Sequence, residues 1–189
     1  EVGGISFTDM QEFHQAWVLS RMRVEVTELP QWRDVVTVKT WINSLENSRS
    51  VRALEMYVNE KKMVGSETFW AVFNTQLRRP EALSLPYEHF ELYPDHKATR
   101  ETFSKINLNH DKEMVFEKTV RLSDLDIVNH ANNVKYLEWC LDLADENKII
   151  NQEIESFEMN FMKELSLKDE VVIHENNEQN TSIFSITKE

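Results

Sequence analysis

The densest group of side chains that could do chemistry lies in residues 123–139, SDLDIVNHANNVKYLEW. His130 has acidic and amide neighbours, and a neutral imidazole near pH 7 can take a proton from an attacking water. Asp126, four residues earlier, could orient that ring and stabilise its cation. The N–H groups that open a helix near Asn132 and Asn133 would carry partial positive charge and could hold an oxyanion. This combination predicts a hydrolase site.

The same run also has a purely structural interpretation. Asn132 or Asn133 could be the N-cap of the helix. Asp124 and Asp126 could stabilise turns, and His130 could be a core histidine. The residue types alone leave both interpretations open.

The elements that must position this run are mostly strands. In residues 17–26, apolar side chains such as Val24 alternate with polar ones such as Arg23, as in a half-buried strand. Similar patterns predict an antiparallel meander that continues with strands at about 36–40, 50–58 and 62–73.

The strand pattern restarts after residue 112. We expect a strand at about 113–123, then a helix from about 133 to 147, and strands near 155, 170 and 181. A helix of about 16 residues would be roughly 24 Å long. Its apolar stripe, which includes Leu137, Cys140 and Leu141, is wide enough to lie against a sheet.

The second set of strands repeats the first. RVEVTELPQWRDVVTV (23–38) superposes on EMNFMKELSLKDEVVI (158–173), with Asp34 on Asp169, an offset of 169 − 34 = 135 residues. By this offset, the first strand and helix of the first unit would precede residue 1, and the last strand of the second unit would follow Glu189. The chain is therefore expected to be truncated at both ends.

These patterns predict two halves and a connection. Residues 1–77 form the N-terminal half, without its first strand and helix, and residues 113–189 form the C-terminal half with the catalytic motif. Residues 78–112 contain three prolines and a polar stretch, which is typical of a linker.

Composition excludes several classes of function. The formal net charge of −12 argues against binding to nucleic acid or to an anionic membrane, and no apolar run approaches the roughly 20 residues of a membrane span. With three glycines and no phosphate-binding glycine motif, nucleotide chemistry is not expected. The histidines show no paired ligand spacing, so no metal site is predicted. A single cysteine, Cys140, fits a reducing compartment, and we expect a cytoplasmic protein.

The run at 123–139 resembles the signature of acyl-acyl-carrier-protein (ACP) thioesterases, in which Asp-x-Asp, His-x-Asn-Asn, Tyr and Trp follow one another. Three further segments resemble the first half of that family: WVLSRMRVEV (17–26), TVKTW (37–41) and FWAVFNTQLRRP (69–80). The resemblance implies an α+β fold, a tandem double hot-dog with antiparallel sheets each wrapped around a long helix. It also implies hydrolysis of fatty-acyl-ACP to free fatty acid and ACP in fatty acid biosynthesis, with no cofactor beyond the phosphopantetheine arm of the substrate.

The resemblance carries site residues over position by position. The family's catalytic aspartate falls on Asp126 and its histidine on His130, but its asparagine falls on Val128, whose side chain cannot donate a hydrogen bond. The family's Glu-Cys pair falls on Glu164 and Leu165, which keeps the acid and loses the thiol.

The implied mechanism is attack by water. His130 would be the general base, Asp126 its orienting partner, and Glu164 a second carboxylate that positions or activates the water. We expect Asn129, Asn132 and Asn133 to contact the substrate. Strict strand alternation would point Glu164 away from the helix, so either a bulge or a site on the other face of the sheet is expected.

Two other functions and one docking surface stay open. An acyl-CoA thioesterase of the hot-dog class would use the same site, whereas a non-catalytic acyl-binding protein would have lost its oxyanion donor at Val128. An acidic ACP would need a local basic patch, for which the sequence offers Arg78, Arg79, Lys97 and Arg100. Monomer and homodimer are both compatible with two units in one chain.

Overall fold

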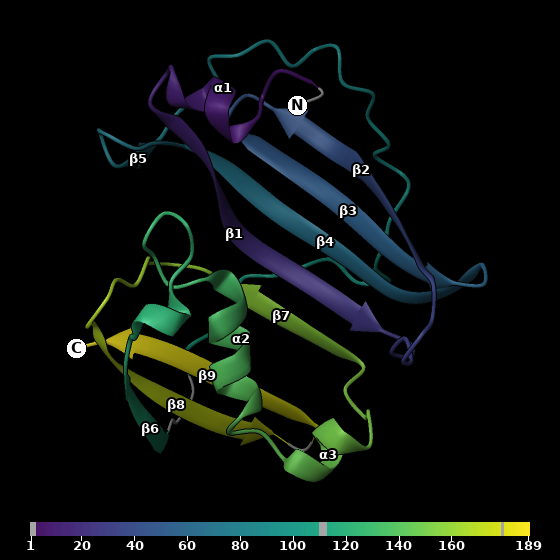
Figure 1. Ribbon diagram of the computed structural model, residues 1–189, viewed down its shortest axis with the longest axis vertical. Coiled ribbons are helices and arrows are strands. Elements are labelled where there is room, and N and C mark those ends of the chain that lie inside the picture. Colours follow the sequence, from purple (N-terminus) through teal and green to yellow (C-terminus); the bar gives the residue numbers. More distant parts are fainter. Residues whose placement is uncertain (1–2, 110–112, 179) are drawn as a thin grey trace. The chain divides into compact units, whose positions relative to one another are not determined.

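A computed structural model describes residues 3–109, 113–178 and 180–189, which form two compact units. Unit 1 runs to Ile106 and regains residues Ile154–Phe161, and unit 2 takes Asn107–Glu153 and Met162–Glu189. Each unit has an antiparallel sheet (Figure 1). The α+β class expected from the sequence is confirmed.

The sheet of unit 1 has the strand order β2-β3-β4-β1-β7, with β5 beside β4. Its elements before the linker are α1 (Phe7–Gln11), β1 (Gln15–Val26), β2 (Val36–Glu46), β3 (Arg49–Val58), β4 (Lys61–Asn74) and β5 (Arg79–Pro80). Asn59 and Glu60 link β3 to β4 with φ values of 48° and 64°, the left-handed geometry of a two-residue hairpin turn. The four predicted strands are thus confirmed.

The predicted four-strand meander is wrong in one connection. Strands β2, β3 and β4 do follow one another, but β1 pairs with β4, from Gln15 opposite Asn74 to Val26 opposite Val64. The connection 27–35 is much longer than a hairpin turn, so it does not force β1 and β2 to be neighbours.

Strand β7 (Ser156–Asn160), which we expected in the C-terminal half, pairs with the free edge of β1 in unit 1. Arg23 lies opposite Glu158, the residue 135 positions later and therefore its own equivalent in the sequence repeat. The local two-fold axis of this ladder passes through the pair. If β1 and β7 had the same sequence, two identical residues would face each other at this position. Here the Arg23 guanidinium instead donates to the Glu158 carboxylate at 2.7 Å.

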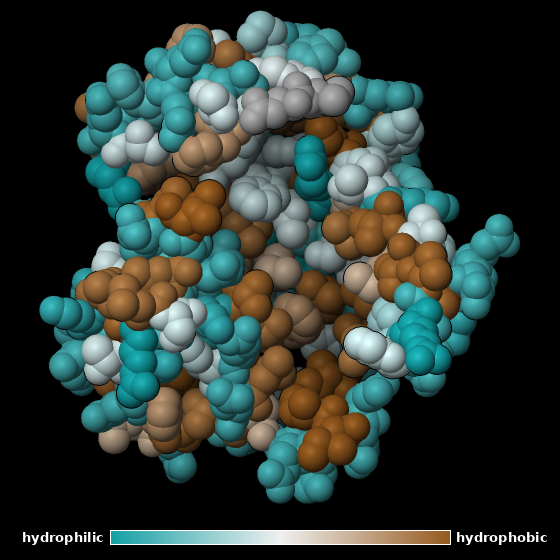
Figure 2. Space-filling model, viewed as in Figure 1, coloured by the Kyte–Doolittle hydropathy of each residue, from teal (hydrophilic) through white to brown (hydrophobic). Residues whose placement is uncertain are grey.

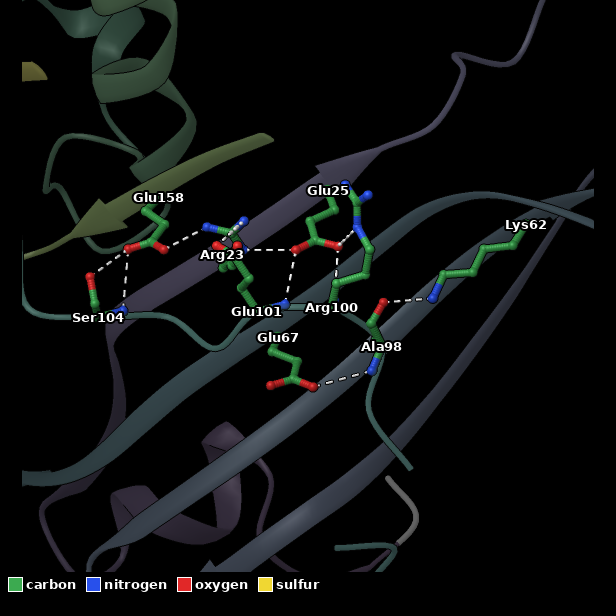
Figure 3. Close-up of polar contacts among 9 residues, drawn as sticks. All are labelled: Arg23, Glu25, Lys62, Glu67, Ala98, Arg100, Glu101, Ser104 and Glu158. Carbon is green, nitrogen blue, oxygen red and sulfur yellow. Dashed lines mark hydrogen bonds and ion pairs between the residues drawn. The ribbon is translucent and has the colours of Figure 1, made fainter. Parts of the chain in front are cut away.

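Part of the predicted linker lies on the sheet of unit 1 (Figure 3). We call residues 96–106 the covering segment. Its backbone N–H groups donate to three carboxylates of the sheet: Glu25 at 2.9 and 3.2 Å, Glu67 at 3.1 Å and Glu158 at 3.2 Å. Lys62 Nζ donates to the backbone oxygen of Ala98 at 2.6 Å. These charge-assisted bonds fix a segment whose sequence resembles a solvated linker.

The Glu25 carboxyl shows the electrostatic result. Burial alone would raise its pKa, but the N–H of Arg100, the Arg23 guanidinium and the N–H of Glu101 outweigh burial and lower that pKa to about 2. The covering segment therefore binds an ionised carboxylate over the usual pH range.

The sheet of unit 2 has the order β6-β8-β9 and faces two short helices (Figure 1). Its elements are β6 (Glu113–Thr119), the 3₁₀ helix η1 (Leu122–Asp124), α2 (Asn133–Leu141), α3 (Glu146–Ile150), β8 (Glu170–Glu178) and β9 (Thr181–Lys188). Trp139 of α2 is buried in a core with Val120, Leu165, Val171 and Ile173.

The long helix expected to run to about residue 147 is wrong, because α2 ends at Leu141. The Asp145 side chain then accepts the N–H of Asn147 at 2.9 Å and caps a second helix, α3. A short acidic side chain at that position competes for backbone N–H groups and favours a new helix start over continuation. None of the described helices is long and apolar enough to cross a bilayer.

Candidate active site

The loop 125–131 is closed at its base by backbone hydrogen bonds. Asn132 N–H donates to the Asp124 oxygen and Asp126 N–H to the His130 oxygen, each at 2.8 Å. On the other side, Ala131 N–H donates to the Leu165 oxygen at 2.8 Å. Three short segments of unit 2, residues 124–126, 130–132 and 164–166, thus lie side by side.

This arrangement brings His130 and Glu164 together. His130 Nε2 lies 3.6 Å from Glu164 Oε2, an ion pair when the ring is protonated. The two side chains are 36% and 35% exposed, so water and substrate can reach both. Glu164 follows the end of β7, so strand alternation does not fix its direction and neither a bulge nor the other face of the sheet is required.

Asp126 is placed differently from its predicted partnership with the imidazole ring. Its Oδ1 accepts the backbone N–H of Val128 at 2.9 Å and of His130 at 3.1 Å. These bonds curl the loop, and Asn129 takes a φ of 65° at its tip. The carboxylate beside the ring is Glu164, and Asp126 holds the backbone that carries the ring.

The asparagines of the motif have separate positions. Asn132 is the N-cap of α2, because its side chain accepts the Val134 N–H at 3.1 Å, which confirms the capping interpretation. Asn133 is the first residue of the helix and is exposed, and its N–H has no acceptor among the described residues. Asn129 is exposed as well.

Two family models match consecutive parts of the sequence. The acyl-ACP thioesterase N-terminal domain matches residues 1–90, and the acyl-ACP thioesterase C-terminal domain matches residues 107–189. The chain belongs to the acyl-ACP thioesterase family. The unmatched stretch between the two models, residues 91–106, contains the whole covering segment.

Curated relatives of this acyl-ACP thioesterase family member are distant in sequence. The palmitoyl-ACP thioesterase of Arabidopsis thaliana is 28% identical over 170 residues, which are 84% of this chain and 40% of the relative. The oleoyl-ACP thioesterase 1 of the same plant is 26% identical over 183 residues, 90% of this chain and 50% of the relative. The chain therefore spans half or less of the length of these relatives.

Solved structures of the family share the fold. The acyl-ACP thioesterase of Bacteroides thetaiotaomicron superposes with a TM-score of 0.87 at 25% identity, over 98% of this chain and 76% of that one. The 12:0-ACP thioesterase of Umbellularia californica gives 0.76 at 21% identity, over 95% and 73% of the two chains. These likenesses confirm the hot-dog fold that the sequence predicted.

One contact of the candidate active site was missed by sequence reasoning. The Tyr136 side chain lies near the backbone of Leu165, next to Glu164, so α2 approaches the segment that carries the acid. Burial raises the pKa of Tyr136, and nearby carboxylates, Glu164 foremost, raise it further. Tyr136 stands in the family signature, which was the available signal.

Cys140 is not suited to be a nucleophile. Burial, with a smaller effect of Glu175, raises the pKa of the Cys140 thiol to about 12. At neutral pH this thiol holds its proton and is not a nucleophile.

The predicted basic docking cluster is partly engaged by the fold. The Arg100 side chain reaches Glu25 at 3.3 Å, and the Arg78 guanidinium lies 5.6 Å from the centre of the Phe73 ring. Lys97 and Arg79 are exposed.

Proposed function

We propose that this protein hydrolyses fatty-acyl-ACP to free fatty acid and ACP in fatty acid biosynthesis. The observation that carries the proposal is the His130–Glu164 pair, with 3.6 Å between Nε2 and Oε2 and both side chains accessible, in a chain of the acyl-ACP thioesterase family. An imidazole beside a carboxylate can deprotonate water and keep the resulting cation stable.

The chemistry follows from these positions. His130 accepts a proton from a water whose oxygen attacks the thioester carbonyl carbon, and the Glu164 carboxylate stabilises the imidazolium. The tetrahedral intermediate then expels the pantetheine sulfur, which takes the proton back from His130 as the carbon–sulfur bond breaks. The products are a carboxylic acid and a free thiol on the carrier.

The oxyanion of the tetrahedral intermediate needs a hydrogen-bond donor. The side chain of Val128 cannot be that donor, so a backbone N–H must take the role. The N–H of Val128 is bound to Asp126 and that of Asn132 to Asp124. We assign the role to the N–H of Asn133, at the positive end of α2. The exposed side chains of Asn129 and Asn133 are then available for the substrate.

The proposed partner is ACP with its phosphopantetheine-linked acyl chain, and the proposed location is the cytoplasm. The substrate's own arm supplies the thioester, so the mechanism requires no further cofactor. Apolar side chains are exposed near the loop before α2 and over α3 (Figure 2), among them Ile127, Val134 and Ile150. Ile127 lies in the loop 125–131 and Val134 just after it, so an acyl chain entering this site would contact these two side chains.

The test is steady-state hydrolysis of a series of acyl-ACPs and of acyl-CoAs of equal chain length. His130→Ala should lower kcat by about 10²-fold or more if His130 is the general base. Glu170→Gln removes an exposed carboxylate of β8 outside the site and serves as the matched control for Glu164→Gln.

Each outcome decides between functions. Turnover of acyl-ACP that depends on His130 supports the proposal. A higher kcat/KM on acyl-CoA would replace ACP by CoA as the carrier. Tight binding of acyl-ACP without turnover would make the protein an acyl-binding protein in which Val128 marks a lost active site.

A further inference from the structure

The base of the catalytic loop depends on Asp124. Its backbone oxygen accepts the N–H of Asn132, where α2 begins, while Leu125 and Ala131 form the next bridge of the same short ladder. Asp124 therefore precedes the loop 125–131 directly. It also accepts the backbone hydrogen bond from Asn132, the residue that follows the loop.

The side chain of Asp124 is 6% exposed and carries a charge that must be compensated. Its Oδ2 accepts the N–H of Arg121 at 2.8 Å and lies 3.7 Å from Lys118 Nζ. A buried carboxylate is strongly destabilised when its counter-charge is removed. Lys118 supplies the nearest counter-charge, and Lys135 on α2 adds a weaker electrostatic attraction.

Lys118 also contacts the helix. Its ammonium group lies 5.0 Å from the centre of the Trp139 ring, and Trp139 is buried in the core of unit 2. Lys118 comes from β6, Trp139 from α2 and Asp124 from η1. One cation thus joins the sheet, the helix and the base of the loop.

We propose that Lys118 and Asp124 are positioning residues for the catalytic loop. Neither has a recorded contact with His130 or Glu164, so both act through the backbone that holds His130 against the segment 164–166. The kinetic part of this inference rests on the proposed function, and the structural part does not.

Lys118→Met keeps most of the alkyl stem over Trp139 and removes the charge. The Asp124 carboxylate then loses its nearest counter-charge and draws in water, and the loop base loosens. Displacement of a reacting group by about 1 Å costs up to about 10²-fold in rate. We expect kcat to fall about 10-fold or more while KM changes by less than about 3-fold, and Lys118→Arg to restore most of kcat.

The matched control is Lys62→Met in unit 1. Lys62 likewise neutralises a nearly buried carboxylate, Glu55, at 2.6 Å, and it has no recorded contact with the catalytic loop. Hydrogen exchange of the Asn132 and Asp126 amides is followed in each variant by NMR, together with kcat, KM and thermal stability. This exchange measurement needs no turnover.

The expected result is faster exchange at both amides, about 10-fold or more, in Lys118→Met and unchanged exchange in Lys62→Met. If the Met variant does not fold, Lys118→Met combined with Asp124→Asn removes both charges together and should restore folding, because the buried carboxylate that needs Lys118 is gone. Equal losses of stability in Lys118→Met and Lys62→Met, with unchanged exchange and kcat, would overturn the inference. Faster exchange in a protein that cleaves no thioester would refute the proposed function and leave the positioning role standing.

Discussion

Gly65→Ala tests how the covering segment is held on the sheet of unit 1. A Cβ built on Gly65 would lie 2.0 Å from the backbone oxygen of Ala98 and 3.0 Å from its carbonyl carbon. Because the obstacle is backbone, no rotamer of Ala98 relieves it. The covering segment must move away by more than an ångström, since non-bonded heavy atoms pack at about 3.5–4.0 Å.

The bonds lost give the magnitude. Ala98 receives a hydrogen bond from Lys62 Nζ at 2.6 Å and donates one to Glu67 Oε1 at 3.1 Å, and Glu67 is only 1% exposed. Hydrogen bonds to charged groups contribute about 1.5–3 kcal/mol each. Replacing glycine by alanine in a strand stabilises the fold by roughly 0.5–1 kcal/mol, because alanine loses less backbone entropy on folding. The expected net loss is about 2–5.5 kcal/mol of unfolding free energy.

The assay is urea unfolding, combined with limited trypsin digestion. A displaced covering segment exposes the bonds after Lys97 and Arg100, so cleavage there should become faster in native buffer. Ser66→Ala, the adjacent residue of β4 on the other face of the sheet, is the control and should lose under about 1 kcal/mol. A Gly65→Ala loss below about 1 kcal/mol with an unchanged digestion pattern would refute the packing described for this segment.

Four further outcomes are expected. Glu164→Gln should lower kcat about 10-fold or more with little change in melting temperature, because the imidazolium loses its counter-charge. Asn132→Ala should cost about 1 kcal/mol of stability through loss of the N-cap, with kcat changed by less than about 3-fold. The pKa of Glu25 is about 2 in the folded protein and near 4.5 in the unfolded one, so its ionised form contributes about 3 kcal/mol to the free energy of unfolding. This contribution is fully present above pH 4.5 and is lost as the pH falls toward 2. Acid unfolding of Glu25→Gln should lack that loss. Cys140 in the native protein should react with a disulfide reagent at pH 8 at least about 10²-fold more slowly than free cysteine.

Each of these has an outcome that contradicts it. A Glu164→Gln variant as active as Glu170→Gln would remove Glu164 from the mechanism. Asn132→Ala that loses turnover but keeps its melting temperature would show a role in substrate binding in place of capping. Identical acid transitions of the parent and of Glu25→Gln would mean that the hydrogen bonds to Glu25 do not lower its pKa. Rapid labelling of native Cys140 would mean that its thiol is accessible.

Local sequence patterns determined much of this protein. Alternation of apolar and polar residues placed the strands, because side chains of a strand point to opposite faces and one face must be buried. The run at 123–139 placed the loop of the candidate active site and offered Asn132 or Asn133 as the N-cap of α2, since a cap depends on only a few neighbouring residues. The repeat of 135 residues also follows from sequence, because equivalent strands need equivalent patterns.

Only the tertiary structure decided which distant segments meet. The partner of β1 is β4 on one side and β7 on the other, and Glu164 lies beside the His130 ring while Asp126 binds backbone. These contacts join residues far apart in the chain, and their free energies depend on burial and charge pairing that no local window contains. The same reason explains Gly65, an ordinary strand position in sequence, whose missing side chain makes room for a segment more than thirty positions later.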